Sequence, residues 1–235
     1  MAEFTFMNTS GELTLSADAI TYGYIGRAQY LAIDTPQGSA SYRARSYAIY
    51  RIEWAGEILP AIELRPGRPV YISSMFREGN TWILYVSCGN GTYDSVGFDN
   101  LEPVDIFVFA APQPGVLTGF NLFSADGATI TADLMRRPMT FNALAIFNGN
   151  QSSAQIPGDI GPMAVIGSPD DYRTTSNYDG SLYVNRIYDK SWLWNGASTL
   201  SKTDSLRLWT REDTSFGSVD IMRNSTAIII SITGL

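Results

Sequence analysis

The chain has 235 residues, of which 45% are hydrophobic, 12% aromatic and 17% charged. That composition excludes a disordered protein, and the length suffices for one large β domain or two domains of roughly 100–120 residues each. The formal net charge is −7 and there is no histidine. These features argue against a nucleic-acid partner and remove the Ser-His-Asp arrangement and most zinc sites, so we expect no cofactor.

Cysteine usage and the apolar runs bear on the compartment. Cys88 is the single cysteine, so no disulfide can form within the chain, and its position after Val86-Ser87 is typical of a packed thiol. The opening MAEFTFMNTS has neither the basic start nor the apolar core of a signal peptide. The longest apolar runs, residues 106–112 and 227–232, are far shorter than the roughly 20 residues that cross a bilayer. We expect no membrane insertion.

Strand signals dominate the first half of the chain. Two alternating runs flank Asn8-Thr-Ser-Gly11 and predict a hairpin beginning at the third residue. A second hairpin is predicted around Arg77-Glu-Gly-Asn80. Residues 105–110 form a continuous apolar run, which is expected of a strand covered on both faces. The strands expected in this half are residues 4–7, 12–15, 30–33, 47–54, 70–76, 81–87 and 105–110.

The segment Ala111-Pro-Gln-Pro-Gly115 is the best linker candidate, because proline on alternate positions cannot lie in a central strand. The residues after this linker resemble the start of the chain. Phe120-Asn-Leu-Phe-Ser-Ala-Asp-Gly127 has the layout of Phe4-Thr-Phe-Met-Asn-Thr-Ser-Gly11, and Leu31-Ala-Ile33 reappears as Leu144-Ala-Ile146. We interpret the chain as all-β, with β-sandwich-like halves at residues 1–113 and 114–235. An internal duplication and a chance match are both open.

The second half continues with short strands and polar turns. A single helical turn is conceivable at residues 133–137 and another at 197–203, and no amphipathic helix is expected. The strands expected here are residues 142–147, 163–166, 181–188, 205–210, 218–222 and 226–232.

Three motifs carry a resemblance to a known family. They are the opening Phe-x-Phe-x-Asn-x-x-Gly-x-Leu from Phe4, its second copy at residues 119–127 with Asp133 and Arg137 following, and the ending Ile228-Ile-Ile-Ser-Ile-Thr-Gly-Leu235. Together they resemble small proteins encoded beside the tail-tip genes of lambda-like siphophages. The resemblance implies a virion protein, made in the host bacterial cytoplasm, whose partners are other phage tail proteins or a second copy. It transfers no binding residues, since the middle of each half departs from the pattern.

Carboxylates are the acid-base groups that remain in number. Asp170 and Asp171 are adjacent, so they face opposite ways in a strand or are solvated in a loop, and Asp94 and Asp99 bracket a glycine turn. A glycan hydrolase needs two carboxyls in one cleft, and no pair stands out. Asn177-Tyr-Asp179 lacks the spacing of a calcium loop and predicts a turn. We therefore expect a protein that is not an enzyme, with a carboxylate-based glycan hydrolase as the weaker alternative.

An aromatic stretch near the C-terminus is the strongest binding candidate. Its rings are interleaved with polar residues, an arrangement that suits a protein interface or a sugar platform, although rings that simply cover a core fit as well. In Ser191-Trp-Leu-Trp194 the two indoles share one strand face and Leu193 takes the other. The stretch contains Tyr172, Tyr178, Tyr183, Tyr188, Trp192 and Trp194.

The last strand is uncharged and rich in isoleucine. It either lies centrally in its own sheet or pairs at an edge with a neighbouring subunit. We expect a structural or binding component of a phage tail tip or tail fibre that acts through protein contacts. The alternative is a receptor-binding module that contacts a host surface glycan or outer-membrane protein. The candidate interface residues are Phe4, Phe6, Tyr172, Tyr178, Tyr183, Tyr188, Trp192, Trp194, Ile228, Ile230 and Ile232.

Overall fold

A computed structural model describes residues 3–8, 11–16, 19–34, 42–88, 101–149, 151–158, 161–169 and 171–235, with side chains from residue 19 onward except at 42 and 43. Over these residues the chain forms two large antiparallel sheets and two separate hairpins, without a helix. The all-β prediction is confirmed. In the described ranges no helix is long and apolar enough to cross a membrane.

The first large sheet, the six-stranded sheet of the described chain, has the order β13-β20-β15-β7-β10-β3. Its strands are short and apolar, and β10 is buried along its whole length, as the continuous apolar run predicted. The strands are β3 (Gly23–Arg27), β7 (Leu59–Glu63), β10 (Ile106–Ala110), β13 (Thr140–Phe147), β15 (Met163–Ile166) and β20 (Ser225–Ser231).

The second, ten-stranded sheet follows the path β14-β18-β17-β8-β9-β6-β4 through the described residues, with three further strands attached beside it. The predicted hairpin around Arg77-Glu-Gly-Asn80 is confirmed, with Gly79 at a φ of 62° in the turn. The path strands are β4 (Gln29–Asp34), β6 (Tyr47–Glu53), β8 (Pro69–Glu78), β9 (Thr81–Ser87), β14 (Ser153–Gln155), β17 (Tyr183–Trp194) and β18 (Thr199–Glu212). The attached strands are β5 (Tyr42–Ala44), β16 (Tyr172–Tyr178) and β19 (Val219–Ile221).

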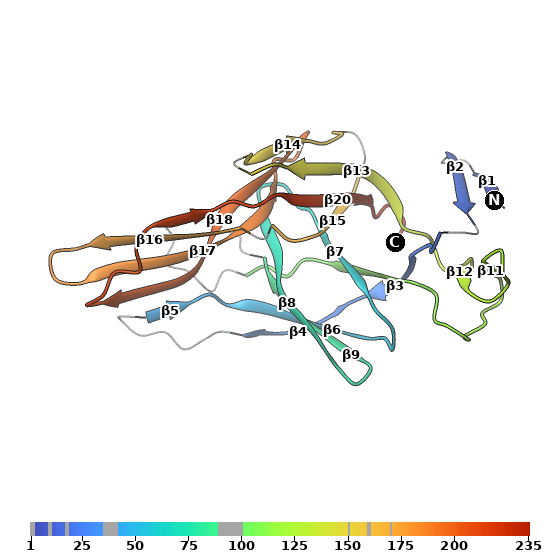
Figure 1. Ribbon diagram of the computed structural model, residues 1–235, viewed down its shortest axis with the longest axis horizontal. Helices are drawn as coiled ribbons and strands as arrows, with labels where there is room; N and C mark the ends of the chain where they lie inside the picture. Colours follow the sequence, from blue (N-terminus) through green and yellow to red (C-terminus); the bar gives the residue numbers. More distant parts are fainter. Residues whose placement is uncertain are drawn as a thin grey trace.

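Two small hairpins carry the repeated sequence motif. The first pairs β1 (Glu3–Asn8) with β2 (Gly11–Ser16), as predicted, and the second pairs β11 (Asn121–Phe123) with β12 (Ile130–Asp133). Both lie at one end of the molecule (Figure 1). The opposite end is a projection that we call the arm, formed by residues 172–189 and 205–222 of β16 to β19 (Figure 1).

The largest cluster of buried apolar side chains among the described residues lies between the large sheets. Fully buried side chains reach it from the ten-stranded sheet, through Leu84 and Trp192, and from the six-stranded sheet, through Ile106, Phe147 and Ile229. Alternation explains the pattern, because β9 sends Trp82, Leu84 and Val86 inward. The arrangement is sandwich-like.

The two halves of the sequence do not form separate sandwiches. In the six-stranded sheet β7 pairs with β15, and in the ten-stranded sheet β8 pairs with β17. The boundary predicted between residues 113 and 114 therefore does not divide the two large sheets, each of which contains strands of both halves. Either half alone would leave the inner faces of both sheets incomplete, so the halves share one core.

The four central strands of the six-stranded sheet are paired symmetrically about the contact between β7 and β15. Ile62 of β7 pairs with Val165 of β15, and their other neighbours are Ile106 of β10 and Ile229 of β20. All four face the inner core, and the next residues, such as Ala61 and Ala164, face the opposite side. This arrangement is what an internal duplication predicts.

One predicted helical turn is wrong. Residues 199–203 belong to β18, where Leu200 and Lys202 point inward and their neighbours do not. Side chains along this segment alternate between inward and outward positions, as in a strand. The strand forms because this alternation buries Leu200 in the shared core, and that burial outweighs the intrinsic preference of the residues. Residues 134–136, in the other candidate, form turns and bends.

Candidate functional site

The two tryptophans proposed as contacts cover the core. Trp192 is completely buried, its indole lies 5.1 Å from the ring of Phe147, and its Nε1–H donates to the carbonyl oxygen of Gly167 at 2.9 Å. Trp194 is half-buried against the same core and donates to the carbonyl of Ala197. The interface role predicted for Trp192 is therefore wrong. The core interpretation, with both indoles on one strand face, is confirmed.

The C-terminal strand offers no free edge. β20 lies between β13 and β15, and Ile228–Ser231 are paired on both sides. Ile230 and Ile232 are buried, and only Ile228 is half-buried. Pairing of this strand with another subunit is thereby excluded, because a strand at the centre of a sheet cannot take a further partner.

The four tyrosines of the aromatic stretch differ in how far their side chains are buried. Tyr188 is buried, whereas Tyr172 and Tyr183 are partly exposed and Tyr178 is 61% exposed. All four lie on the arm, Tyr188 at its junction with the body. Phe4 and Phe6 fall in β1, whose side chains lie outside the described part of the chain.

The tip of the arm is a tight turn between two tyrosines. The rings of Tyr178 and Tyr183 are 5.2 Å apart, and Asp179 accepts hydrogen bonds from the backbone N–H groups of Leu182 and Ser181 at 3.0 and 3.1 Å. These bonds lower the pKa of Asp179 to about 2. The prediction of turn chemistry at Asp179 is confirmed.

A buried asparagine holds the flank of the arm. Asn185 is 1% exposed; its Nδ2–H donates to the carbonyl of Thr214 at 2.9 Å, and its Oδ1 accepts from the N–H of Phe216 at 3.1 Å. The hydroxyl of Ser176 donates to the same oxygen at 2.5 Å. Residues 214–216 are thereby fixed against β16 and β17.

The outer face of the six-stranded sheet is apolar up to its last strand. On β13, Phe141, Leu144 and Ile146 are 57%, 49% and 52% exposed, and they pair with Ile230, Ile228 and Thr226. A sheet that faces water on one side normally alternates apolar and polar residues. We call these three side chains the β13 strip. The sequence pattern did not indicate this surface, although two of its members belong to the repeated Leu-Ala-Ile motif.

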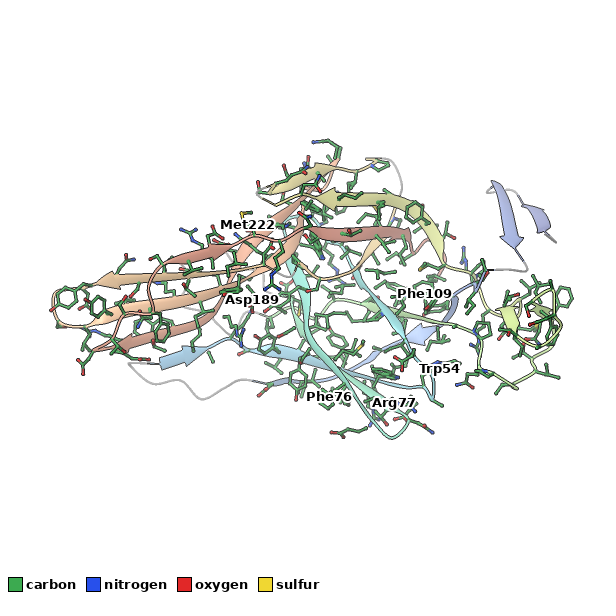
Figure 2. The ribbon with its side chains drawn as sticks, viewed as in Figure 1. Trp54, Phe76, Arg77, Phe109, Asp189 and Met222 are labelled. Atoms are coloured by element: carbon green, nitrogen blue, oxygen red, sulfur yellow. The ribbon has the colours of Figure 1, made fainter. Side chains whose placement is uncertain are left out.

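A groove opens where β17 changes its partner. Along one edge β17 pairs with β16 as far as Asp189, and then with β8 only at Trp192 and Leu193. Beyond Val70, β8 turns away to follow β9, so β8 and β16 diverge and leave a groove of about 690 Å³. Asp189 lies there, where the arm meets the body (Figure 2).

Asp189 is the acceptor on the wall of the groove. The hydroxyl of Tyr71 donates to its Oδ2 at 2.6 Å, and the Arg207 guanidinium lies 3.6 Å from its Oδ1. Burial raises the pKa of Tyr71 well above its usual value, with the Tyr47 and Asp189 charges adding to the effect. Tyr71 therefore stays a neutral donor, and Asp189 keeps lone pairs for a further hydrogen bond.

A buried ion pair lies beside the groove, which Asp171 lines. Lys202 Nζ lies 2.6 Å from Asp171 Oδ2, and both side chains are fully buried. The pair also holds the backbone of Arg223: its N–H donates to Asp171 Oδ1 at 2.5 Å, and its carbonyl accepts from Lys202 at 3.1 Å. The expectation of a solvated loop position for Asp171 is therefore wrong. Asp94, Asp99 and Asp170 lie outside the described residues.

Little in the sequence could have revealed the groove. Its residues come from segments more than a hundred positions apart, and neither Arg207 nor Arg223 stands in a motif.

Among the described residues no group of three or more His, Cys, Asp or Glu is placed to hold a metal ion. Burial raises the pKa of the Cys88 thiol to about 11, which makes it a poor nucleophile at neutral pH.

Comparison with known proteins returned no match: no protein family, no curated protein and no solved structure is similar to this chain. The geometry of the surfaces therefore carries the functional argument.

Proposed function

We propose that the chain is a non-enzymatic structural component of a phage virion, attached to the tail tip or tail fibre through protein contacts. The observation that carries the proposal is the β13 strip. Phe141, Leu144 and Ile146 form a half-exposed apolar row on the terminal strand of the six-stranded sheet.

The strip has the properties of a surface that another chain covers. Contiguous exposed apolar residues are uncommon on a monomer and mark contact sites. β13 also ends its sheet in the described part of the chain, and terminal strands are where a further strand can pair. The repeat of the motif supports this use, because Leu31 and Ile33 are likewise exposed on β4, the terminal strand on the ten-stranded path.

Support for a tail location comes from the sequence motifs. The opening motif forms the β1–β2 hairpin and its second copy forms the β11–β12 hairpin. These are the segments that resemble the siphophage tail-tip proteins. Their common position at one end of the molecule suits a shared docking end (Figure 1).

The experiment is mass spectrometry of purified, salt-washed particles, with the copy number set against the major tail protein. We expect a few copies per particle in the tail fraction. The double variant Leu144→Glu/Ile146→Glu should fold but be lost from particles, because charges on the strip cannot be buried at an interface. The control is Leu117→Glu, an exposed residue after the linker. Absence of the unchanged chain from particles, or normal incorporation of the double variant, would contradict the proposal.

A second function is favoured by the groove. Its walls combine an aromatic ring, hydroxyls and charged groups, which are the elements of a polar ligand site. We propose that a receptor-binding role toward a host surface glycan is the alternative to a purely structural role.

A further inference from the structure

Arg223 brings an uncompensated positive charge to the groove. Arg223 is exposed and is one of the residues that line the groove, and within the described residues its guanidinium makes neither a hydrogen bond nor an ion pair. The nearby Asp171 is neutralised by Lys202, and Asp189 faces Arg207. The groove therefore carries one more positive than negative charge among these groups.

The backbone of Arg223 is held in place by hydrogen bonds within the protein. Its backbone N–H and carbonyl are both held by the buried Asp171–Lys202 pair, at 2.5 and 3.1 Å. A surface arginine in a plain loop has no such anchor. Because the backbone is already ordered in the free protein, a ligand that pairs with this guanidinium has to order the side chain alone.

We infer that the groove binds an acidic saccharide, with the carboxylate of a uronic-acid unit paired to Arg223. A guanidinium binds a carboxylate through two parallel hydrogen bonds. The exposed ring of Tyr172 offers a face for the sugar, and Asp189 and the hydroxyls of Ser73 and Ser74 lie on the walls for its hydroxyl groups.

An acidic peptide fits the groove less well. A peptide would add to the edge of β8 that faces the groove, where β8 is unpaired beyond Val70 in the described chain. A bulge between Ile72 and Ser74 interrupts that segment, and an irregular edge disrupts the regular ladder of an added strand. A saccharide needs no ladder.

This inference rests on the proposed receptor-binding role and is independent of the β13 strip, so each can fail alone. The test is titration of the full chain with tetragalacturonic acid, followed by calorimetry and by amide chemical shifts. We expect shifts confined to residues around the groove and a dissociation constant of about 1 mM or below. The fully methyl-esterified tetramer, which lacks the carboxylate, should bind at least about tenfold more weakly.

Two variants locate the site. Arg223→Gln and Tyr172→Ala should each weaken binding by about tenfold or more, while Arg51→Gln, an exposed arginine on β6, should leave it unchanged. Both groove residues are exposed, so folding is preserved, and thermal unfolding checks this. No binding of the acid, equal binding of the ester, or equal weakening by Arg51→Gln would overturn the inference. Tighter binding of tetraglutamate would assign the groove to an acidic peptide instead.

Discussion

The two halves of the chain build one core but carry different additions. In the first half β7 and β10 pair Ile62 with Ile106, and in the second half β15 and β20 pair Val165 with Ile229 in matching positions. The long hairpins of the two halves differ. β8 and β9 stay within the body, whereas β17 and β18 lengthen into the arm, with β16 and β19 added beside them.

The difference shows which features the fold requires and which are additions. Both halves supply the inner faces of the two sheets, so both are needed for the core. The groove, the tyrosine tip and the β13 strip all depend on strands of the second half. We interpret the shared strands as the scaffold, to which the second half adds the arm, the β13 strip and one wall of the groove.

Expressing the two halves as separate chains should have the largest effect on folding. We expect neither residues 1–113 nor 114–235 to fold alone, because β7–β15 and β8–β17 pairing joins them and the core takes side chains from both. Circular dichroism and urea titration measure this. A cooperative unfolding transition in either fragment would show that one half is a domain in its own right.

The buried ion pair of the second half should matter far more than an exposed one in the first. Lys202→Met leaves Asp171 charged and buried, which costs about 3–5 kcal/mol of unfolding free energy. Arg27 and Asp105 form a pair that is nearly half exposed on both sides, so Arg27→Met should cost less than about 1 kcal/mol. Urea unfolding of both variants provides the measurement. Equal costs would mean that the Lys202 pair is hydrated.

Removing the arm's asparagine should have an intermediate effect. Asn185→Ala leaves the N–H of Phe216 and the carbonyl of Thr214 without their partner, at a cost of about 1–3 kcal/mol. The loss should be local, so limited proteolysis should cut near residues 214–216 while the body stays protected. Cleavage spread over the whole chain would show instead that the arm and the body unfold together.

A further effect expected is a pH dependence that originates in the first half. Burial raises the pKa of Cys88 from 9.0 to about 11. The thiol's contribution to stability is therefore fully present below pH 9 and is lost as pH rises to 11, since the unfolded thiol ionises first. Comparison with the Cys88→Ala variant separates the contribution of the thiol from the contributions of ionising tyrosines. Unfolding can be followed by tryptophan fluorescence, to which Trp192 and Trp209 of the second half contribute. If the halves unfold as one, this signal should show the same loss of stability between pH 9 and pH 11.

Local structure was largely predictable from the sequence. Alternating runs around Asn8-Thr-Ser-Gly11 and Arg77-Glu-Gly-Asn80 are enough to predict hairpins, and the apolar run at residues 105–110 predicted the strand β10 buried on both faces. These features depend on residues close together in the chain, where period and turn chemistry decide the outcome.

Pairing between distant strands was beyond prediction. Nothing in the residues of β7 specifies β15 as its neighbour, because many apolar strands fit one another equally well. The burial of Trp192, the central place of β20 and the groove all result from that pairing. The aromatic stretch thus indicated the right region, while its deepest members belong to the core.

The two long strands also determine how the arm bears load. β17 and β18 pair without a break from Tyr183 and Glu212 near the tip to Trp194 and Leu200 in the core, apart from one bulge at Ile187/Tyr188. Hydrogen bonds between antiparallel strands lie perpendicular to the strand axis. The two strands are connected at the core end, between Trp194 and Thr199, so a pull that moves Tyr183 and Glu212 apart opens these bonds one after another, starting at the tip. The arm therefore separates from its tip inward, and the pairs next to the core open last.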